Sequence, residues 1–197
     1  MSYIRQKDVD RRQIGFQRNK GKVAAMNEVF QTNAKKEDIK SYRNEQITTD
    51  ELSMILAAGS YAAKGMGQQT TVIVAVQDPE IMAQLSGLNA RIIGKDEDPF
   101  CGAPTLIIVF ADMEQLTVNE EGSLIVSNMM LAAASIGVDF CRVNHAKEVF
   151  ELEEGLLFKR QWGVPENYMG LAQCLLGYCG DALETDERES ERIIRII

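Results

Sequence analysis

Two segments of the sequence could hold a small anionic ligand. Lys35, Lys36 and Lys40 place three cations within six residues, and clustered ammonium groups bind phosphate or carboxylate through charge-assisted hydrogen bonds. Residues 63–69 are rich in small side chains, and glycines in such a loop let the backbone come close to a ligand. Taken alone, the first segment is more typical of an exposed charged turn, and the second is more typical of an ordinary glycine-rich connection.

Other kinds of catalytic or binding chemistry find little support in the residue types. The single histidine, His145, has no Ser or Cys at a spacing that indicates a catalytic triad, and its place near a predicted helix start favours a surface residue. Neither GxGxxG nor GxxxxGK occurs, so no phosphate-binding glycine loop of these types is predicted. The cysteines form no CxxC pair, which argues against a structural zinc site. The four cysteines are Cys101, Cys141, Cys174 and Cys179.

Composition favours one globular domain preceded by a basic extension. The 197 residues are 45% hydrophobic, 25% charged and 7% aromatic, close to the average for globular proteins. The net charge of −8 argues against a nucleic-acid partner, because such binding depends on Lys and Arg. Residues 1–25 carry +5 without apolar periodicity, so we expect an N-terminal extension there and the main domain at 26–197. An alternative hypothesis is that translation of the natural protein starts at Met26.

The apolar segments predict neither a secretory signal nor a membrane span. Residues 1–25 lack the apolar core of a signal peptide. The longest apolar stretch, Leu124–Val138, is interrupted by polar residues and is shorter than the ~20 residues that a membrane helix needs. Cysteines without a disulfide framework are typical of a reducing compartment. We therefore expect a cytoplasmic protein with no membrane partner.

Two helices are predicted from clear start signals. Thr48 and Glu51 have the spacing of a capping box, and apolar residues then recur at helical spacing, which indicates one buried face. Asp78 followed by Pro79 predicts the start of the second helix. The expected buried residues are Leu52, Ile55, Leu56 and Gly59 in the first helix and Ile81, Leu85, Leu88 and Ile92 in the second.

Two more helices are predicted farther along the chain. After Glu121-Gly122-Ser123, the segment Leu124–Ile136 is apolar nearly all round, which predicts a central buried helix that ends at Gly137. Such a helix belongs either to the core of one chain or to an interface between two chains. Val149–Phe158 is predicted to be a further single helix.

The predicted strands do not alternate regularly with the helices. β-branched and apolar runs indicate strands at 71–76, 105–110 and 171–178, a short strand or loop at 140–143, and a terminal strand or arm at 192–197. This mixture favours an α+β layered fold, with a central mixed or antiparallel sheet flanked by helices.

Five separated motifs occur in order along the chain. They are residues 36–42, residues 63–70, Gly102-Ala103-Pro104 with the apolar strand after it, Asn128–Ala133, and Gly163–Glu166 together with Leu176-Gly177-Tyr178. From Met26 onward this set resembles the nitroreductase family of flavin-dependent oxidoreductases. Asn128–Ala133 matches the buried family helix letter for letter, and Gly137 and Cys141 follow as expected.

The resemblance implies FMN bound at a homodimer interface, with NAD(P)H as the hydride donor and no obligatory catalytic side chain. Lys36 and Lys40 match family positions that hold the phosphate and the flavin edge, and Arg188 lies about where a last basic phosphate ligand is placed. Gly65 and Gln69 would line the flavin from the loop. The cofactor-binding residues implied are Lys36, Glu37, Asp38, Lys40, Lys64, Gly65, Gln69, Arg142, Val143, Asn144 and Arg188; no metal ligand is implied.

The chain departs from the family pattern close to the expected phosphate. Asp38 stands where the family prefers serine, Glu37 replaces a usually basic residue, and lysine at 36 and 40 cannot reproduce the bidentate grip of arginine. Gly67 replaces an asparagine in the loop, while Lys64 adds a cation. These departures imply weaker FMN binding or a rearranged phosphate site.

Two functions follow as hypotheses. The first is an FMN-dependent oxidoreductase that passes a hydride from NAD(P)H to nitroaromatic or quinone-like acceptors. The second is a degenerate homologue that binds flavin weakly or not at all and acts as a binding or interaction protein. Retention of FMN by the purified protein distinguishes them.

Overall fold

The computed structural model describes residues 4–5, 39, 41–62, 71–114, 118–181 and 193–194. The chain divides into two compact units. Glu37–Leu183 forms one, and Met1–Lys36 together with Glu184–Ile197 forms the other. In the latter, β1 (Ile4–Arg5) pairs antiparallel with β6 (Ile193–Ile194). Of the two alternatives predicted for 192–197, a strand or an arm, the structure has a strand at 193–194. The predicted domain start at residue 26 lies outside the described residues and stays a prediction.

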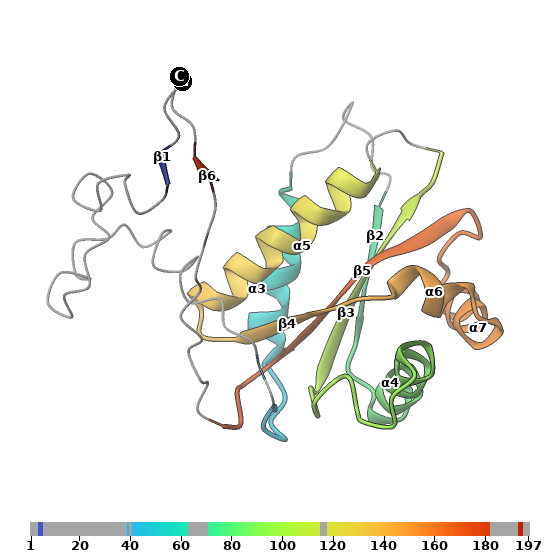
Figure 1. The fold of residues 1–197 in the computed structure, drawn as a ribbon, viewed down its shortest axis with the longest axis horizontal. Coiled ribbons are helices and arrows are strands. Elements are labelled where there is room, and N and C mark those ends of the chain that lie inside the picture. The colour runs from blue at the N-terminus through green and yellow to red at the C-terminus, as the bar shows by residue number, and fades with distance from the viewer. Residues whose placement is uncertain are drawn as a thin grey trace, which may run out of the picture. The chain divides into compact units, whose positions relative to one another are not determined.

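The larger unit is built on a four-stranded antiparallel sheet (Figure 1). Its strands are β2 (Thr71–Val76), β3 (Thr105–Asp112), β4 (Asp139–Val143) and β5 (Tyr168–Gly177), in the spatial order β2-β3-β5-β4. Residues of β3 are buried on both faces of the sheet, as the continuous apolar sequence predicts. Of the two alternatives, mixed or antiparallel, the structure has the antiparallel sheet.

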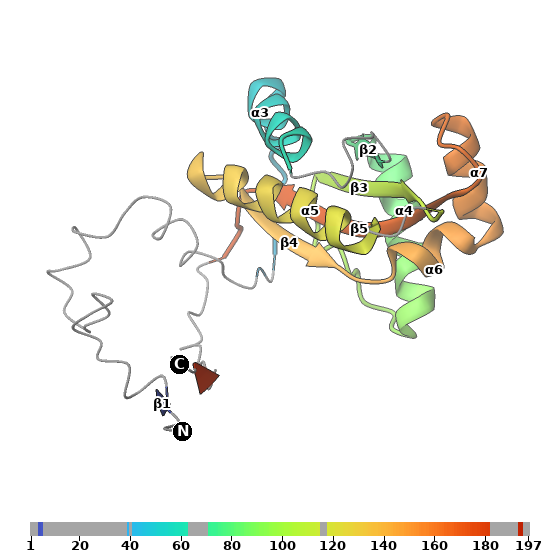
Figure 2. The ribbon, with the colours of Figure 1, turned by 90° about the horizontal axis from the view of Figure 1, so that it is seen from above.

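Helices cover both faces of this sheet, which confirms the layered α+β fold (Figures 1 and 2). The helices α3 (Thr49–Ser60) and α5 (Val118–Ser135) pack on one face, where the core includes Ile55, Ile107, Val109, Met129 and Leu176. The helices α4 (Pro79–Ile93), α6 (Ala146–Glu151) and α7 (Glu153–Gln161) pack on the other, where the core includes Leu85, Leu106, Phe110, Phe150 and Leu175.

Local sequence signals set the starts of α3 and α4 as predicted. The Thr48 hydroxyl accepts a hydrogen bond from the Glu51 amide at 3.2 Å, and the Glu51 carboxylate accepts one from the Thr48 amide at 2.7 Å. The Asp78 carboxylate caps α4, whose first residue is Pro79. Gly59 allows α3 to approach α5 closely, since a Cβ there would lie 2.9 Å from Met129 Cγ.

The central helix α5 begins earlier than predicted, at Val118 rather than Leu124. Gly122 therefore lies inside the helix, where a Cβ would meet the Leu171 Cδ1 atom of β5 at 2.6 Å; the glycine permits close packing on the sheet and does not break the helix. The expectation of burial on all sides is wrong for a single chain, because the Leu124 side of α5 is open and Leu124 is 45% exposed.

The predicted single helix at Val149–Phe158 is wrong, since the structure has two helices there. Leu152 takes an extended conformation, with φ −68° and ψ 154°, and separates α6 from α7. The two helices meet tightly, because a Cβ on Gly155 would lie 2.0 Å from the Val149 carbonyl oxygen. Apolar spacing continues through the break, so the pattern alone did not reveal it. None of the helices in the described part of the chain combines the length and hydropathy needed to cross a membrane.

Candidate functional site

Three of the predicted cofactor-binding residues lie in the described part of the chain, and all three are at the end of β4. Val143 is the last residue of that strand, Arg142 precedes it and Asn144 follows it. The other predicted residues, Lys36, Glu37, Asp38, Lys40, Lys64, Gly65, Gln69 and Arg188, lie outside the described residues. Their placement stays a prediction.

The end of β4 presents polar groups that the described chain does not use. Val143 is buried and pairs with Gln173 of β5, whereas the side chains of Arg142 and Asn144 are exposed. Within the described residues, neither the Arg142 guanidinium nor the Asn144 amide has a hydrogen-bond or ion-pair partner. An exposed guanidinium at the end of the strand and an amide two positions later, just after it, form a donor set suited to the polar edge or anionic group of a ligand. This donor set fits FMN.

The open edge of the sheet makes these groups accessible. Among the described strands, β4 pairs with β5 alone, so its other edge is free of strand partners there. Arg142 and Phe140 alternate with Cys141 and Val143, and Phe140 packs in the core beneath α5. Arg142 therefore lies on the α5 face of β4. A ligand held by Arg142 would lie beside the partly open helix α5.

His145, which the sequence pattern favoured as a surface residue, immediately follows these residues and has an unusual backbone. Its φ of 70° lies in the left-handed region, where residues other than glycine, asparagine and aspartate are rare. The imidazole Nδ1 lies 3.8 Å from the Glu148 Oε1 atom, and the His145 side chain is 38% exposed. Adjacency to positions 142–144 was the one sequence signal that could have singled it out.

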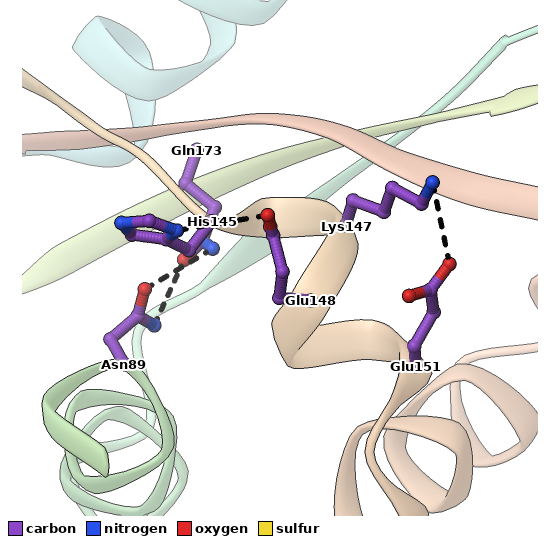
Figure 3. Close-up of polar contacts among 6 residues, drawn as sticks. All are labelled: Asn89, His145, Lys147, Glu148, Glu151 and Gln173. Atoms are coloured by element: carbon purple, nitrogen blue, oxygen red, sulfur yellow. Dashed lines mark hydrogen bonds and ion pairs between the residues drawn. The ribbon is translucent and has the colours of Figure 1, made fainter. Parts of the chain in front are cut away.

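A buried amide pair lies under the same end of β4. Asn89 of α4 and Gln173 of β5 are both fully buried. The Asn89 Nδ2 atom donates to the Leu85 carbonyl at 2.9 Å and to Gln173 Oε1 at 3.3 Å (Figure 3). The amide pair therefore fixes α4 against β5. Because Gln173 is also the strand partner of Val143, it links α4 to the end of β4 at which the loop 143–145 begins. Sequence reasoning did not identify it.

The opposite end of β4 lies beside the residue that follows Lys40. The Gly180 amide donates to the Ser41 carbonyl at 2.9 Å, and Tyr42 forms a β-bridge with Cys179. The Cys179 amide in turn donates to Asp139 Oδ2 at 2.7 Å, at the first residue of β4. Ser41 and Asn144 thus lie near opposite ends of this five-residue strand, which is roughly 13 Å long.

Tyr42 is buried at this junction with its hydroxyl unsatisfied. Its side chain is 8% exposed, and its Oη atom has no hydrogen-bond partner among the described residues. Burial raises the pKa of the phenol, and the neighbouring Cys141 raises it further. The Tyr42 backbone amide donates to the Cys101 carbonyl at 3.0 Å. Tyr42 is therefore a neutral core residue that anchors the segment after Lys40.

Two of the four cysteine thiols lie in environments that do not favour nucleophilic chemistry. All four cysteines are free. Burial raises the pKa of the Cys174 thiol to about 12, and burial together with Asp98 raises the pKa of Cys101. Since the thiolate is the reactive form of cysteine, these two thiols are poor nucleophiles near neutral pH. Within the described residues, no group of three or more His, Cys, Asp or Glu side chains could hold a metal ion.

Comparison with known proteins identifies relatives over most of the chain. The sequence model of the Nitroreductase family matches residues 34–178. A nitroreductase with bound FMN from Bacteroides fragilis NCTC 9343 has 28% identity and a TM-score of 0.79, with 87% of this chain and 100% of that chain covered. No curated protein matches the sequence.

Further solved structures share the fold at lower identity. A nitroreductase with bound FMN from Desulfitobacterium hafniense DCB-2 has 21% identity and a TM-score of 0.77, over 87% of this chain and 100% of that one. An FMN-dependent nitroreductase from Clostridium difficile R20291 has 21% identity and a TM-score of 0.68, over 82% of this chain and 92% of that one. At this level of identity the likeness shows the layered fold alone.

Proposed function

Because the chain belongs to the nitroreductase family, we propose that it is an FMN-dependent oxidoreductase. The observation that carries the proposal is the likeness to the FMN-bound Bacteroides fragilis structure, which extends over 100% of that chain. We further propose NAD(P)H as the electron donor and electron-poor nitroaromatic or quinone-like compounds as acceptors. FMN supplies the hydride chemistry when bound, and the protein supplies binding, orientation and electrostatics.

Two groups of residues make up the proposed binding site. Arg142 and Asn144 offer exposed donors without partners in the described chain, and they would hold polar atoms of the ring system. Lys36, Lys40 and Arg188 would hold the dianionic phosphate, in a protein whose net charge is −8. Solvent can deliver the protons of the reaction, so no side chain is needed as an acid or base. The raised pKa values of Cys101 and Cys174 agree with a mechanism that uses no cysteine nucleophile.

We also propose that the protein is a cytoplasmic homodimer whose interface includes α5. Leu124 is 45% exposed and Met54 of the adjacent helix α3 is 50% exposed. Half-buried Met130 and Leu131 lie on the same helix as Leu124. Apolar side chains exposed on adjoining helices are typical of a surface that a protein partner covers. Since Arg142 lies on this face of the sheet, the cofactor would bind beside the interface.

The first test is the visible absorption spectrum of the purified protein, recorded before and after addition of FMN and desalting. Flavin bands that survive desalting are the expected result. NADH and NADPH oxidation by the loaded protein, with a quinone or nitroaromatic acceptor, then tests the activity. Parallel initial-rate lines are expected, because the donor leaves before the acceptor binds at the same site. A protein that remains colourless after reloading contradicts the proposal.

The sequence around the expected phosphate favours a second candidate, a homologue with weak flavin binding that acts through protein interactions. Glu37 and Asp38 bring two carboxylates close to Lys36 and Lys40, and these carboxylates would repel the phosphate. Replacement Asp38→Ser tests this reading. Stronger FMN retention by the variant indicates a weakened but intact site, whereas a variant that still binds no FMN favours the second candidate.

A further inference from the structure

The amide pair of Asn89 and Gln173 lies in an otherwise apolar part of the core. Both residues are 0% exposed. Gln173 stands in the sheet between Ile108 of β3 and Val143 of β4, and both of these neighbours belong to the apolar core on the α4 face. Burial of an amide costs free energy that its hydrogen bonds only offset, and an apolar pair of similar size fills such a space about equally well. Stability alone therefore does not account for two amides here.

The two side chains are joined in one defined orientation. The Asn89 Nδ2 atom donates to the Leu85 carbonyl at 2.9 Å and to Gln173 Oε1 at 3.3 Å, which uses both of its hydrogens. The Gln173 Nε2 atom donates back to Asn89 Oδ1 at 3.5 Å (Figure 3). Hydrogen bonds weaken when their distance or angle changes, whereas the hydrophobic effect has no preferred direction. The pair therefore fixes where α4 lies on the sheet more closely than apolar packing does.

The amide pair also lies beside the end of β4. Gln173 is the strand partner of Val143, the last residue of β4. Only Asn144 and His145 separate that strand from α6, which begins at Ala146. The first end of this two-residue loop is therefore held by β5, at the residue whose side chain is bonded to α4.

The other end of the loop is held by the same two elements. Phe150 of α6 belongs to the buried cluster that contains Leu85 of α4. The start of α6 lies directly on β5, since a Cβ on Gly170 would lie 2.6 Å from the Ala146 carbonyl oxygen. The position of α4 against β5 therefore sets where both ends of the loop lie.

We propose that Asn89 and Gln173 are positioning residues, whose amide pair holds the end of β4 and the loop after it in the place that cofactor binding requires. The inference rests on the proposed function, in which Arg142 and Asn144 hold polar atoms of FMN. Both amides are fully buried, so they act through the backbone of residues 142–144 and not by contact with the cofactor. Binding groups must be held to within roughly 0.5 Å of their productive geometry. A small shift of α4 against β5 therefore weakens FMN binding.

The test separates placement from stability by comparing single and double replacements. Asn89→Leu and Gln173→Met each leave one buried amide without its partner, which should lower the melting temperature of the apo-protein by about 5 °C. The double variant has no amide left, and its apolar side chains are of similar size, so its melting temperature should return to within about 2 °C of wild type. The dissociation constant of FMN is measured by titration of each apo-protein, well below all the melting transitions.

The affinity for FMN should not recover together with the stability. We expect the dissociation constant of the double variant to be about tenfold above that of wild type, because the directional bonds are lost although the space is filled. Thr105→Val is the matched control. Thr105 is also 0% exposed and donates to Gln46 Oε1 at 2.6 Å, but it pairs with Leu176, away from the end of β4. This control should melt at a lower temperature and keep the wild-type dissociation constant.

The outcomes distinguish the inference from the function on which it rests. A double variant that binds FMN as tightly as wild type shows that the pair serves the fold alone and overturns the inference. Equal losses of affinity in the control and in the single variants overturn it as well, since affinity then follows stability; this comparison holds even if the double variant does not fold. A wild-type protein that binds no FMN overturns the proposed function itself.

Discussion

At the scale of single residues, the hydroxyl of Tyr42 is a buried donor without a partner in the described chain. Leaving such a group unpaired costs about 1–3 kcal/mol, because it loses its hydrogen bonds to water. Tyr42→Phe should therefore raise the free energy of unfolding by about 1 kcal/mol. Urea denaturation of the apo-protein measures this change. A lower stability would mean that the hydroxyl has a partner among residues such as Lys40, outside the described part.

Asp98 shows the contrasting case of a carboxylate with many partners. It accepts hydrogen bonds from the Phe100 amide at 2.9 Å, from the Gly102 amide at 2.8 Å and from the Ser86 hydroxyl. These contacts hold the loop in which Cys101 and Gly102 both have positive φ. Partial burial raises the pKa of Asp98, but the hydrogen bonds outweigh it and leave the pKa below its ordinary value.

The lowered pKa of Asp98 gives its contribution a definite pH dependence. The ionised form is favoured in the folded state, so the stabilisation is complete above the unfolded pKa of about 3.9 and is lost as the pH falls through the lower folded value. Asp98→Asn should cost about 1 kcal/mol at neutral pH. It should also flatten the loss of stability below about pH 4. Urea midpoints measured from pH 3 to pH 7 test both effects, and parallel profiles for wild type and variant would contradict the assignment.

At the scale of elements, the junction between α6 and α7 depends on Gly155. A Cβ there would lie 2.0 Å from the Val149 carbonyl oxygen and 2.8 Å from the Phe150 Cα, and neither backbone atom can move aside cheaply. Gly155→Ala should therefore lower the free energy of unfolding by about 3 kcal/mol. Gly87→Ala is the control, because Gly87 lies inside α4 with nothing within 4 Å of its Cβ position. It should instead stabilise the protein by about 0.5–1 kcal/mol. Chemical denaturation of both variants measures the two changes in the free energy of unfolding. Equal changes would contradict the close packing at Gly155.

The elements that were predicted correctly are those with local signals at their ends. The strand at 71–76 and the start of α4 at Pro79 match the structure, because β-branched runs and the Asp-Pro pair act within a few residues. The break at Leu152 was missed because it depends on Gly155 packing against the end of the preceding helix. The early start of α5 was missed because Gly122, which suggests a turn locally, is required by contact with Leu171. Tertiary packing, rather than propensity, sets these two boundaries.

At the scale of the whole molecule, the larger unit joins segments that are far apart in the sequence. Ser41 and Asp181 are 140 positions apart, yet the Ser41 hydroxyl donates to the Asp181 carboxylate at 2.9 Å. Sequence motifs and the family resemblance identified Arg142, Val143 and Asn144 as a group, but only the sheet register shows that they lie at the end of β4 remote from Ser41. The conformation of His145 was also beyond prediction, since no local pattern requires positive φ in a histidine.

The outward side of α5 provides the last prediction, which concerns assembly. Removing an apolar side chain such as Leu124, 45% exposed, from water contributes roughly 1.5–3 kcal/mol when it is fully buried. A carboxylate in its place would have to lose its hydration without a partner. Leu124→Glu should therefore shift the protein from a dimer to a monomer of 22.0 kDa at micromolar concentration, as measured by analytical ultracentrifugation.

The control for assembly is Leu157→Glu, because Leu157 is 49% exposed on α7, which covers the opposite face of the sheet (Figure 2). This variant should remain dimeric. If binding of FMN depends on the interface, the Leu124 variant should lose FMN retention together with its dimeric mass, while the Leu157 variant keeps both. A wild-type protein that sediments as a monomer would contradict the dimer. A monomeric variant that retains FMN fully would place the cofactor site within one chain, away from the interface.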